Sequence, residues 1–192
     1  AHSKNGIRRA GGIAELVRLL DHESAGIQKL SACALTNLAH NAWPEYGTLC
    51  EEVAVEVRLA RCPNSGLGGF EQLLKLLQSA PTEVAEWCAA ALCNLSLCSE
   101  ESRENLTQAG AVESVVAAVN RLLPDRWHHD AARGAHSSSF ISQFTVESLT
   151  WIPNSKAELL GELLVSTLCN LAAGSAHRGA RLHADISEAR GG

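Results

Sequence analysis

Four residues between 128 and 136 have side chains that commonly bind transition metals: His128, His129, Asp130 and His136. Imidazole nitrogens and carboxylate oxygens are ordinary metal ligands in proteins. Adjacent histidines, however, point in different directions, and no regular element in this stretch would hold the four side chains around one ion. We therefore expect no metal and no other cofactor.

The seven cysteines offer a second kind of chemistry. Cys88, Cys93 and Cys98 recur at intervals of five, and on a helix five positions turn a side chain by about 140° beyond a full turn, so the three do not share a face. No Cys-x-x-Cys pair occurs. We expect reduced cysteines acting as small apolar side chains in an intracellular protein, cytoplasmic or nuclear, with a disulfide or metal site as the alternative.

The short motifs that mark common catalytic sites are absent from the sequence. It has no Gly-x-Gly-x-x-Gly, no phosphate-binding loop, no nucleophile elbow and no His-Glu-x-x-His. The glycine cluster over 65–69 is typical of a turn before a helix, and no pair of carboxylates is set up for acid–base catalysis. We predict that the protein is not an enzyme.

Composition argues against several classes of partner. The 192 residues carry a formal net charge of −5, so no excess of positive charge favours a nucleic-acid partner. No apolar run reaches the roughly 18 residues that a membrane-spanning helix needs. Hydrophobic residues make up 46% of the chain and aromatic residues only 4%, a mixture that suits closely packed helices better than strands.

Asparagine in a repeated Leu-x-Asn-Leu motif is the strongest signal in the chain. The motif occurs at 35–38, 92–95 and 168–171, each time near the end of an apolar stretch with helical spacing. A second helical stretch precedes it, and Gly12 to Asn37 and Gly69 to Asn94 are each 25 positions. A short polar helix ending in Ala-Gly comes earlier still, where glycine suits a left-handed turn. We expect repeated three-helix units.

These units resemble the armadillo repeat of the β-catenin-like family, whose length is about 40–47 residues. The resemblance implies an all-α, right-handed solenoid with units at about 3–41, 46–98 and 99–174 and a partial fourth at 175–192. Uneven spacing predicts two loop insertions, at about 42–67, around a displaced helix over 51–61, and at about 124–157. The chain begins at Ala1 and contains no methionine, so we expect both ends to be cuts through a longer protein. Such a fragment lacks capping repeats and is expected to self-associate.

The second insertion holds large aromatic residues, among them Trp127 and Trp151. A large aromatic side chain outside a repeat core needs somewhere to be buried. The segment is interpreted either as a loop, folded onto the solenoid or poorly ordered, or as a partner-binding or autoinhibitory loop.

In armadillo proteins the third helix of each unit lines a concave groove, and the resemblance places the binding face there. Positions seven and four before the asparagine, the asparagine itself and four after it share one helix face. The predicted partner-binding groove consists of Leu30, Cys33, Asn37, Asn41, Trp87, Ala90, Asn94, Leu163, Ser166 and Asn170. An amide has both donors and an acceptor and so matches a peptide backbone. The alternative is that the asparagines brace neighbouring helices.

We predict a non-catalytic scaffold that binds a protein or peptide segment in this groove. Importin-α relatives carry tryptophan four residues before the asparagine, where this chain has Cys33, Ala90 and Ser166, which argues against a receptor for basic nuclear-localisation peptides. A more apolar ligand with Trp87 as the main contact suits the lining better. Two alternatives remain: the recognition region of a larger enzyme such as a U-box E3 ubiquitin ligase, or a cytoskeleton- or cilium-associated armadillo protein.

Overall fold

The protein is described by a computed structural model that covers residues 2–40, 47–122 and 159–173. The labelled helices are α1 (His2–Arg9), α2 (Gly12–Leu19), α3 (Ala25–Ala39), α4 (Gly47–Leu59), α5 (Gly69–Ser79), α6 (Thr82–Cys98), α7 (Glu100–Gln108) and α8 (Ala111–Leu122). A further helix covers 159–173. Within these ranges there is no strand, and Arg61 and Gly68 form an isolated bridge. No described helix is both long and apolar enough to cross a membrane.

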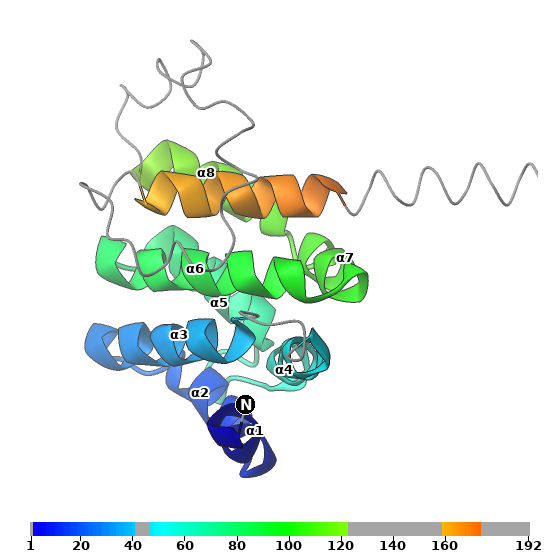
Figure 1. Cartoon of the computed structure of the whole chain (residues 1–192). Helices are drawn as coiled ribbons and strands as arrows, with labels where there is room; N and C mark the ends of the chain where they lie inside the picture. The colour runs from blue at the N-terminus through cyan, green and yellow to red at the C-terminus, as the bar shows by residue number, and fades with distance from the viewer. Residues whose placement is uncertain (1, 41–46, 123–158, 174–192) are drawn as a thin grey trace, which may run out of the picture.

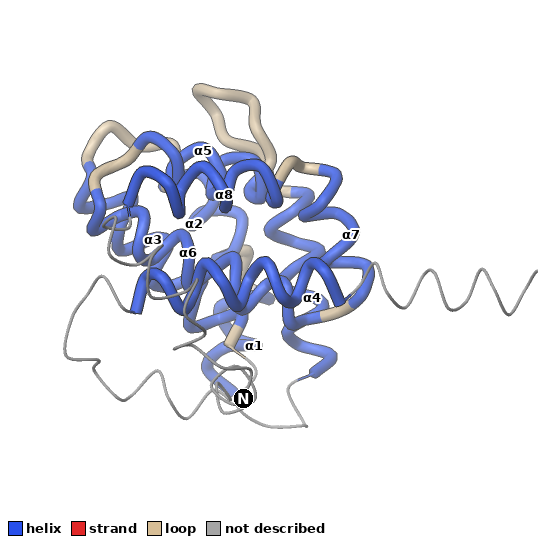
Figure 2. The backbone as a smooth tube through the Cα atoms, turned by 90° about the horizontal axis from the view of Figure 1, so that it is seen from above, coloured by secondary structure: helices blue, strands red, loops and turns tan. Residues whose placement is uncertain are grey.

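The helices are arranged in three rows (Figure 1). The third helices, namely α3, α6 and the helix over 159–173, lie one above the other, with α2, α5 and α8 behind them and α1, α4 and α7 at one end. Seen from above, α5 and α8 overlap and α4 and α7 lie near each other, as expected for stacked units (Figure 2). The predicted all-α solenoid is thus confirmed. The insertion expected at 124–157 and the partial unit at 175–192 lie outside the described residues.

Glycines set two of the turns between the first and second helices. Gly11 has φ 76° and Gly110 has φ 83°, in the left-handed region that side chains other than glycine rarely adopt. They stand at the predicted Ala-Gly positions of the first and third units. In the second unit a longer loop replaces this turn, and the displaced helix expected over 51–61 is present as α4. The insertion expected at about 42–67 therefore contains a complete helix.

Leucines of the repeated motif form much of the core. Leu35, Leu38, Leu92 and Leu95 are buried, as is Leu171. Burying one such side chain stabilises the fold by about 1.5–3 kcal/mol relative to leaving it exposed. The third helices form because these apolar positions recur at helical spacing, and they stack because each unit buries its stripe against the next.

A polar network fastens the loop between α4 and α5 to the end of α2. The Asp21 carboxylate accepts hydrogen bonds from the backbone N–H groups of Asn64 and Ser65, both at 2.8 Å. The buried Gln72 side chain of α5 donates to the Leu20 carbonyl at 3.2 Å and accepts from the Ser65 hydroxyl at 3.2 Å. This network fixes where α5 packs, and with it the start of the second unit's α6.

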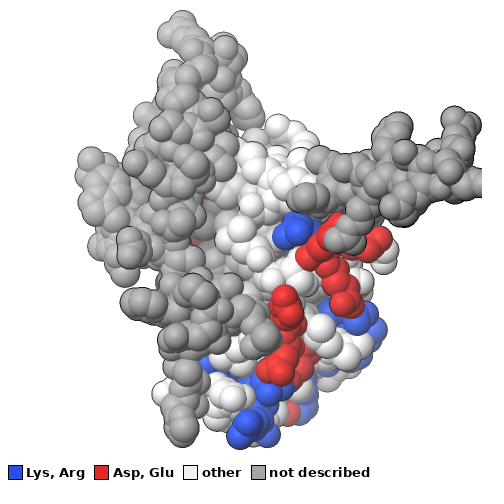
Figure 3. All heavy atoms as spheres, turned by 45° about the vertical axis from the view of Figure 1, so that its right-hand side comes forward, with Lys and Arg blue, Asp and Glu red and all other residues white. Residues whose placement is uncertain are grey.

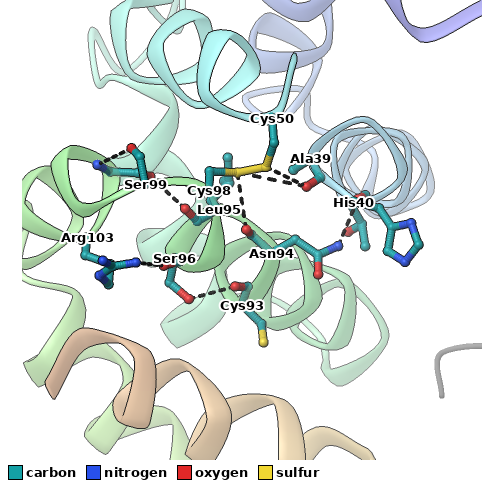
Figure 4. The surroundings of a disulfide bond; sticks show 12 residues. Ala39, His40, Cys50, Cys93, Asn94, Leu95, Ser96, Cys98, Ser99 and Arg103 are labelled. Carbon is teal, nitrogen blue, oxygen red and sulfur yellow. Dashed lines mark hydrogen bonds between the residues drawn. A yellow bond between two sulfur atoms is a disulfide. The ribbon is translucent and has the colours of Figure 1, made fainter. Parts of the chain in front are cut away.

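Cys50 and Cys98 form a disulfide that joins α4 to α6 (Figure 4). The prediction that all cysteines are reduced is therefore wrong for this pair. The two residues are 48 positions apart and meet only because α4 packs against the end of α6, so a spacing argument along one helix could not find them. The remaining cysteines are free: Cys33, Cys62, Cys88, Cys93 and Cys169.

Candidate partner-binding site

The predicted binding face is best exposed on α3. Leu30 is 69% exposed, Asn37 is exposed and Cys33 is half-buried. These residues are three and four positions apart and therefore lie on one side of the helix. The Asn37 amide contacts the Cys33 sulfur at 3.8 Å, a long and weak interaction. On α3 the predicted residues form an outward-facing stripe. Asn41 lies outside the described residues.

On α6 the equivalent residues are less accessible. Trp87 is partly buried and packs against the core, while Ala90 is buried. Asn94 is only 6% exposed, and its Nδ2 donates to the Thr36 carbonyl of α3 at 3.0 Å. Thr36 in turn donates from its hydroxyl to the Trp87 carbonyl at 3.3 Å. The Asn94 amide therefore braces α6 against α3, as the alternative interpretation of these asparagines expected.

The helix over 159–173 repeats this arrangement one step further along the stack. The Asn170 amide donates to the Ser96 hydroxyl of α6 at 2.9 Å. Asn170 and Ser166 keep partial exposure, whereas Leu163 is buried. The structure thus brings the nine described groove residues onto three adjacent helices but leaves Ala90, Asn94 and Leu163 with little accessible surface.

Two features of this face were missed by sequence reasoning. Leu97, three residues after Asn94, is 46% exposed. Lys29 of α3 and Glu83 of α6 form an ion pair at 2.9 Å, and hydrogen bonding to Glu83, together with its charge, raises the pKa of Lys29. Leu97 could have been found by adding the position three after the asparagine to the stripe. The ion pair joins two helices, and no spacing within one repeat reports it.

A second surface lies over α1, α4 and α7. A cleft of about 530 Å³ there is lined by Arg8, Glu51, Glu52, Val55, Glu56, Ser99 and Glu101. Acidic and basic side chains stand next to each other on this side of the molecule (Figure 3). Arg8 forms ion pairs with Glu52 and Glu56, each at 3.0 Å, so part of the acidic charge is neutralised within the protein.

The free buried cysteines are poorly suited to nucleophilic chemistry. Burial raises the pKa of Cys93 to about 11 and that of Cys88 further still. Burial, followed by the charge of Asp21, raises the pKa of Cys62 to about 11. The thiolate is the reactive form of cysteine, and it is scarce at neutral pH when the pKa is this high. No group of three or more potential metal ligands occurs within the described part of the chain.

Stacked units that each contribute a leucine-lined third helix to one row define an armadillo-type solenoid. Residues 7–40 match the armadillo/β-catenin-like repeat, which confirms the predicted resemblance there. An engineered protein whose crystal structure was solved by the Northeast Structural Genomics Consortium is similar, with a TM-score of 0.51 and 26% identity over 90% of this chain and 67% of its own.

Two further solved structures show weaker similarity. A second engineered protein from the same consortium has a TM-score of 0.35 and 24% identity over 89% of this chain and 50% of its own. A designed armadillo repeat protein has a TM-score of 0.29 and 20% identity, covering 86% of each chain. Comparison with curated proteins finds no match.

Proposed function

We propose that this armadillo solenoid is a non-catalytic scaffold that binds a protein or peptide segment across its third-helix face, the surface of α3, α6 and the helix over 159–173. The observation that carries the proposal is the 69% exposure of Leu30 on that face. Completely burying a leucine contributes about 1.5–3 kcal/mol, so a partner that covers Leu30 gains a large part of this energy. Leu97, which is 46% exposed and lies near the C-terminal end of α6, extends the apolar contact along the face.

Asn37 is the asparagine best placed to bind a peptide backbone. The amides of Asn94 and Asn170 already donate to α3 and α6, whereas Asn37 is exposed and its amide makes, among the described residues, a long contact with Cys33. An amide side chain donates and accepts at once, as a peptide group does. The proposed site is therefore centred on Leu30 and Asn37, with Trp87 on the neighbouring α6 and Ser166 further along the face on the helix over 159–173.

Charge on this face supports a ligand with apolar anchors rather than a strongly charged one. Lys29 and Glu83 neutralise each other across the boundary between α3 and α6. A basic or acidic peptide would gain little from a pair that is already satisfied, since exposed ion pairs contribute little. We infer that the partner presents one or two apolar side chains next to accessible backbone.

Five free cysteines also bear on where the protein works. Secreted proteins seldom keep unpaired thiols, because oxidising compartments convert them to disulfides. We propose an intracellular location, cytoplasmic or nuclear. Fluorescence microscopy of the tagged protein tests this proposal. The measured quantity is the fraction of the protein that co-localises with cytosolic, nuclear and secretory markers.

A peptide-display experiment tests the binding site directly. The full chain selects binders from a library of random peptides, and fluorescence anisotropy then measures the Kd of the enriched peptides. Leu30→Glu and Asn37→Ala should each weaken binding, Leu30→Glu by at least about tenfold, which corresponds to about 1.4 kcal/mol. Leu19→Glu is the matched control, because Leu19 is an exposed leucine (39%) on α2, away from the third-helix face. Equal binding by the wild type and Leu30→Glu, or equal weakening by the control, would refute the assignment.

A further inference from the structure

The Cys50–Cys98 disulfide lies where three helices meet. Cys50 is in the first turn of α4, Cys98 is the last residue of α6, and their Cα atoms are 5.3 Å apart. Both residues are buried, at 2% and 8% exposure. The carbonyl of Ala39, the last residue of α3, lies 3.0 Å from the Cys50 sulfur. The cross-link therefore joins two helices of the second unit beside the point where the first unit ends (Figure 4).

The same surroundings suit both oxidation states of this pair. A disulfide sulfur carries no hydrogen, whereas a thiol is a weak donor. After reduction, the Cys50 thiol has the Ala39 carbonyl as acceptor at 3.0 Å, and the Cys98 thiol has the Asn94 carbonyl at 3.3 Å. A reduced cysteine also packs well in an apolar interior, where it behaves as a small hydrophobic side chain. Neither state leaves a buried sulfur group without an interaction.

Other buried cysteines compete poorly in disulfide exchange. The thiolate is the attacking species, and burial raises the pKa of Cys62, Cys88 and Cys93 well above the usual value for a thiol. Cys50 and Cys98, in contrast, stand at two helix ends with their Cα atoms 5.3 Å apart, so they are placed to exchange with each other. Cys98, at a helix end, becomes accessible when the last turn of α6 opens, since helix termini open more readily than helix centres.

We propose that Cys50 and Cys98 are a reversible redox cross-link that locks α4 to the C-terminal end of α6 when oxidised and releases it when reduced. The oxidant is a low-molecular-weight disulfide. The Cys50 thiolate attacks one of its sulfurs, the S–S bond breaks, and one small thiolate leaves. The Cys98 thiolate then attacks the Cys50 sulfur of the mixed disulfide, forms the protein disulfide and releases the second small thiolate. The two cysteines lose two electrons and two protons, which the two released thiols carry away.

The cross-link is expected to control the rigidity of one end of the third-helix face. Asn94, which braces α6 against α3, lies one helical turn before Cys98. With the disulfide open, α4 and the last turn of α6 lose their covalent link and are held by packing, hydrogen bonds and the ion pairs of Arg8 with Glu52 and Glu56. Their backbone amides should then exchange with solvent faster, while α5 and α2, which do not carry the cross-link, should change little. This role is independent of the proposed scaffold function.

A redox titration of the full chain tests the proposal. The folded protein is equilibrated in buffers with varied ratios of reduced to oxidised glutathione, quenched with acid and alkylated, and mass spectrometry then quantifies each cysteine pair. We expect the Cys50–Cys98 disulfide to form as the buffer becomes oxidising and to reopen when it becomes reducing. Hydrogen exchange in α4 and at the end of α6 should be at least about tenfold faster in the reduced chain, a change that corresponds to about 1.4 kcal/mol in local opening.

Two double variants serve as controls. Cys33→Ala with Cys169→Ala should titrate as the wild type does, whereas Cys50→Ala with Cys98→Ala should show no redox-dependent exchange. The proposal is overturned if the two thiols stay unlinked in oxidised glutathione, if another pair forms instead, or if excess reduced glutathione fails to open the bond in the folded chain. The wild-type titration alone decides these outcomes, even if the second double variant does not fold.

Discussion

Replacing Asn94 with alanine measures how strongly the motif asparagine holds neighbouring units together. Asn94 is 6% exposed, and its amide donates to the Thr36 carbonyl at 3.0 Å. The change removes a hydrogen bond between helices, which contributes about 1 kcal/mol net, and leaves a buried carbonyl with one donor fewer, which costs about 1–3 kcal/mol when no other donor replaces it. We expect Asn94→Ala to lower the free energy of unfolding by about 2 kcal/mol.

Asn37 provides a control with the same residue type at the same motif position. It is exposed, and its amide's interaction within the described part of the chain is the long one with the Cys33 sulfur, at 3.8 Å, so Asn37→Ala should change the free energy of unfolding by less than about 0.5 kcal/mol. Urea unfolding followed by far-ultraviolet circular dichroism measures both. With a slope of about 2 kcal/mol per molar urea, Asn94→Ala shifts the midpoint by about 1 M. Equal shifts for the two variants would show that the hydrogen bond to Thr36 is not what distinguishes them.

An isosteric change at the same position adds a pH test. Asn94→Asp keeps the shape but puts a carboxyl group against the Thr36 carbonyl, where burial raises its pKa in the folded state above that in the unfolded state. Below the unfolded-state pKa both states are protonated, and the carboxyl can donate as the amide did. As pH rises towards the folded-state pKa, the unfolded chain releases its proton first and the variant loses stability. A stability difference from the wild type that does not vary with pH would contradict this reasoning.

Two further predictions concern the turns and the thiols. Gly11→Ala should lower the free energy of unfolding by about 1–2 kcal/mol in urea unfolding, through backbone strain alone, because φ is 76° and no atom lies within 4 Å of the added methyl group. Gly6→Ala, where φ is not positive and the space is also open, is its control and should not be destabilising. Cys93 in the folded chain, with a pKa raised to about 11, should react with iodoacetamide slowly near neutral pH and about tenfold faster per pH unit up to that value, as followed by mass spectrometry. Equally fast labelling of native and urea-unfolded chain near neutral pH would show that burial does not protect this thiol.

Much of the fold could be predicted because it depends on local patterns. The leucines of each Leu-x-Asn-Leu motif are at helical spacing, and all four in the first two copies are buried as expected. The Ala-Gly turns require a left-handed glycine, and Gly11 and Gly110 adopt that conformation. The helix expected over 51–61 is present at Gly47–Leu59, so its position was right to within a few residues.

The behaviour of the motif asparagines could not be predicted from the motif. Asn37 and Asn94 occupy the same position in their units, yet one is exposed and the other is buried against Thr36. The difference comes from the neighbouring helix that supplies the acceptor, and a repeat read by itself does not contain that neighbour. The Cys50–Cys98 bond was missed for the same reason, since its two residues meet through the packing of α4 on α6.

The hydrogen bonds that the Asn94 amide donates to Thr36 and the Asn170 amide donates to Ser96 link successive third helices. Sliding one helix along its neighbour by a single turn, about 5.4 Å, breaks such a hydrogen bond, because its two heavy atoms cannot be more than about 3.5 Å apart. A small tilt between the two helices leaves the bond intact. These hydrogen bonds therefore oppose sliding between neighbouring third helices more than bending of the stack. A long ligand would therefore bind a surface whose curvature can change while the contact points on successive third helices keep their register.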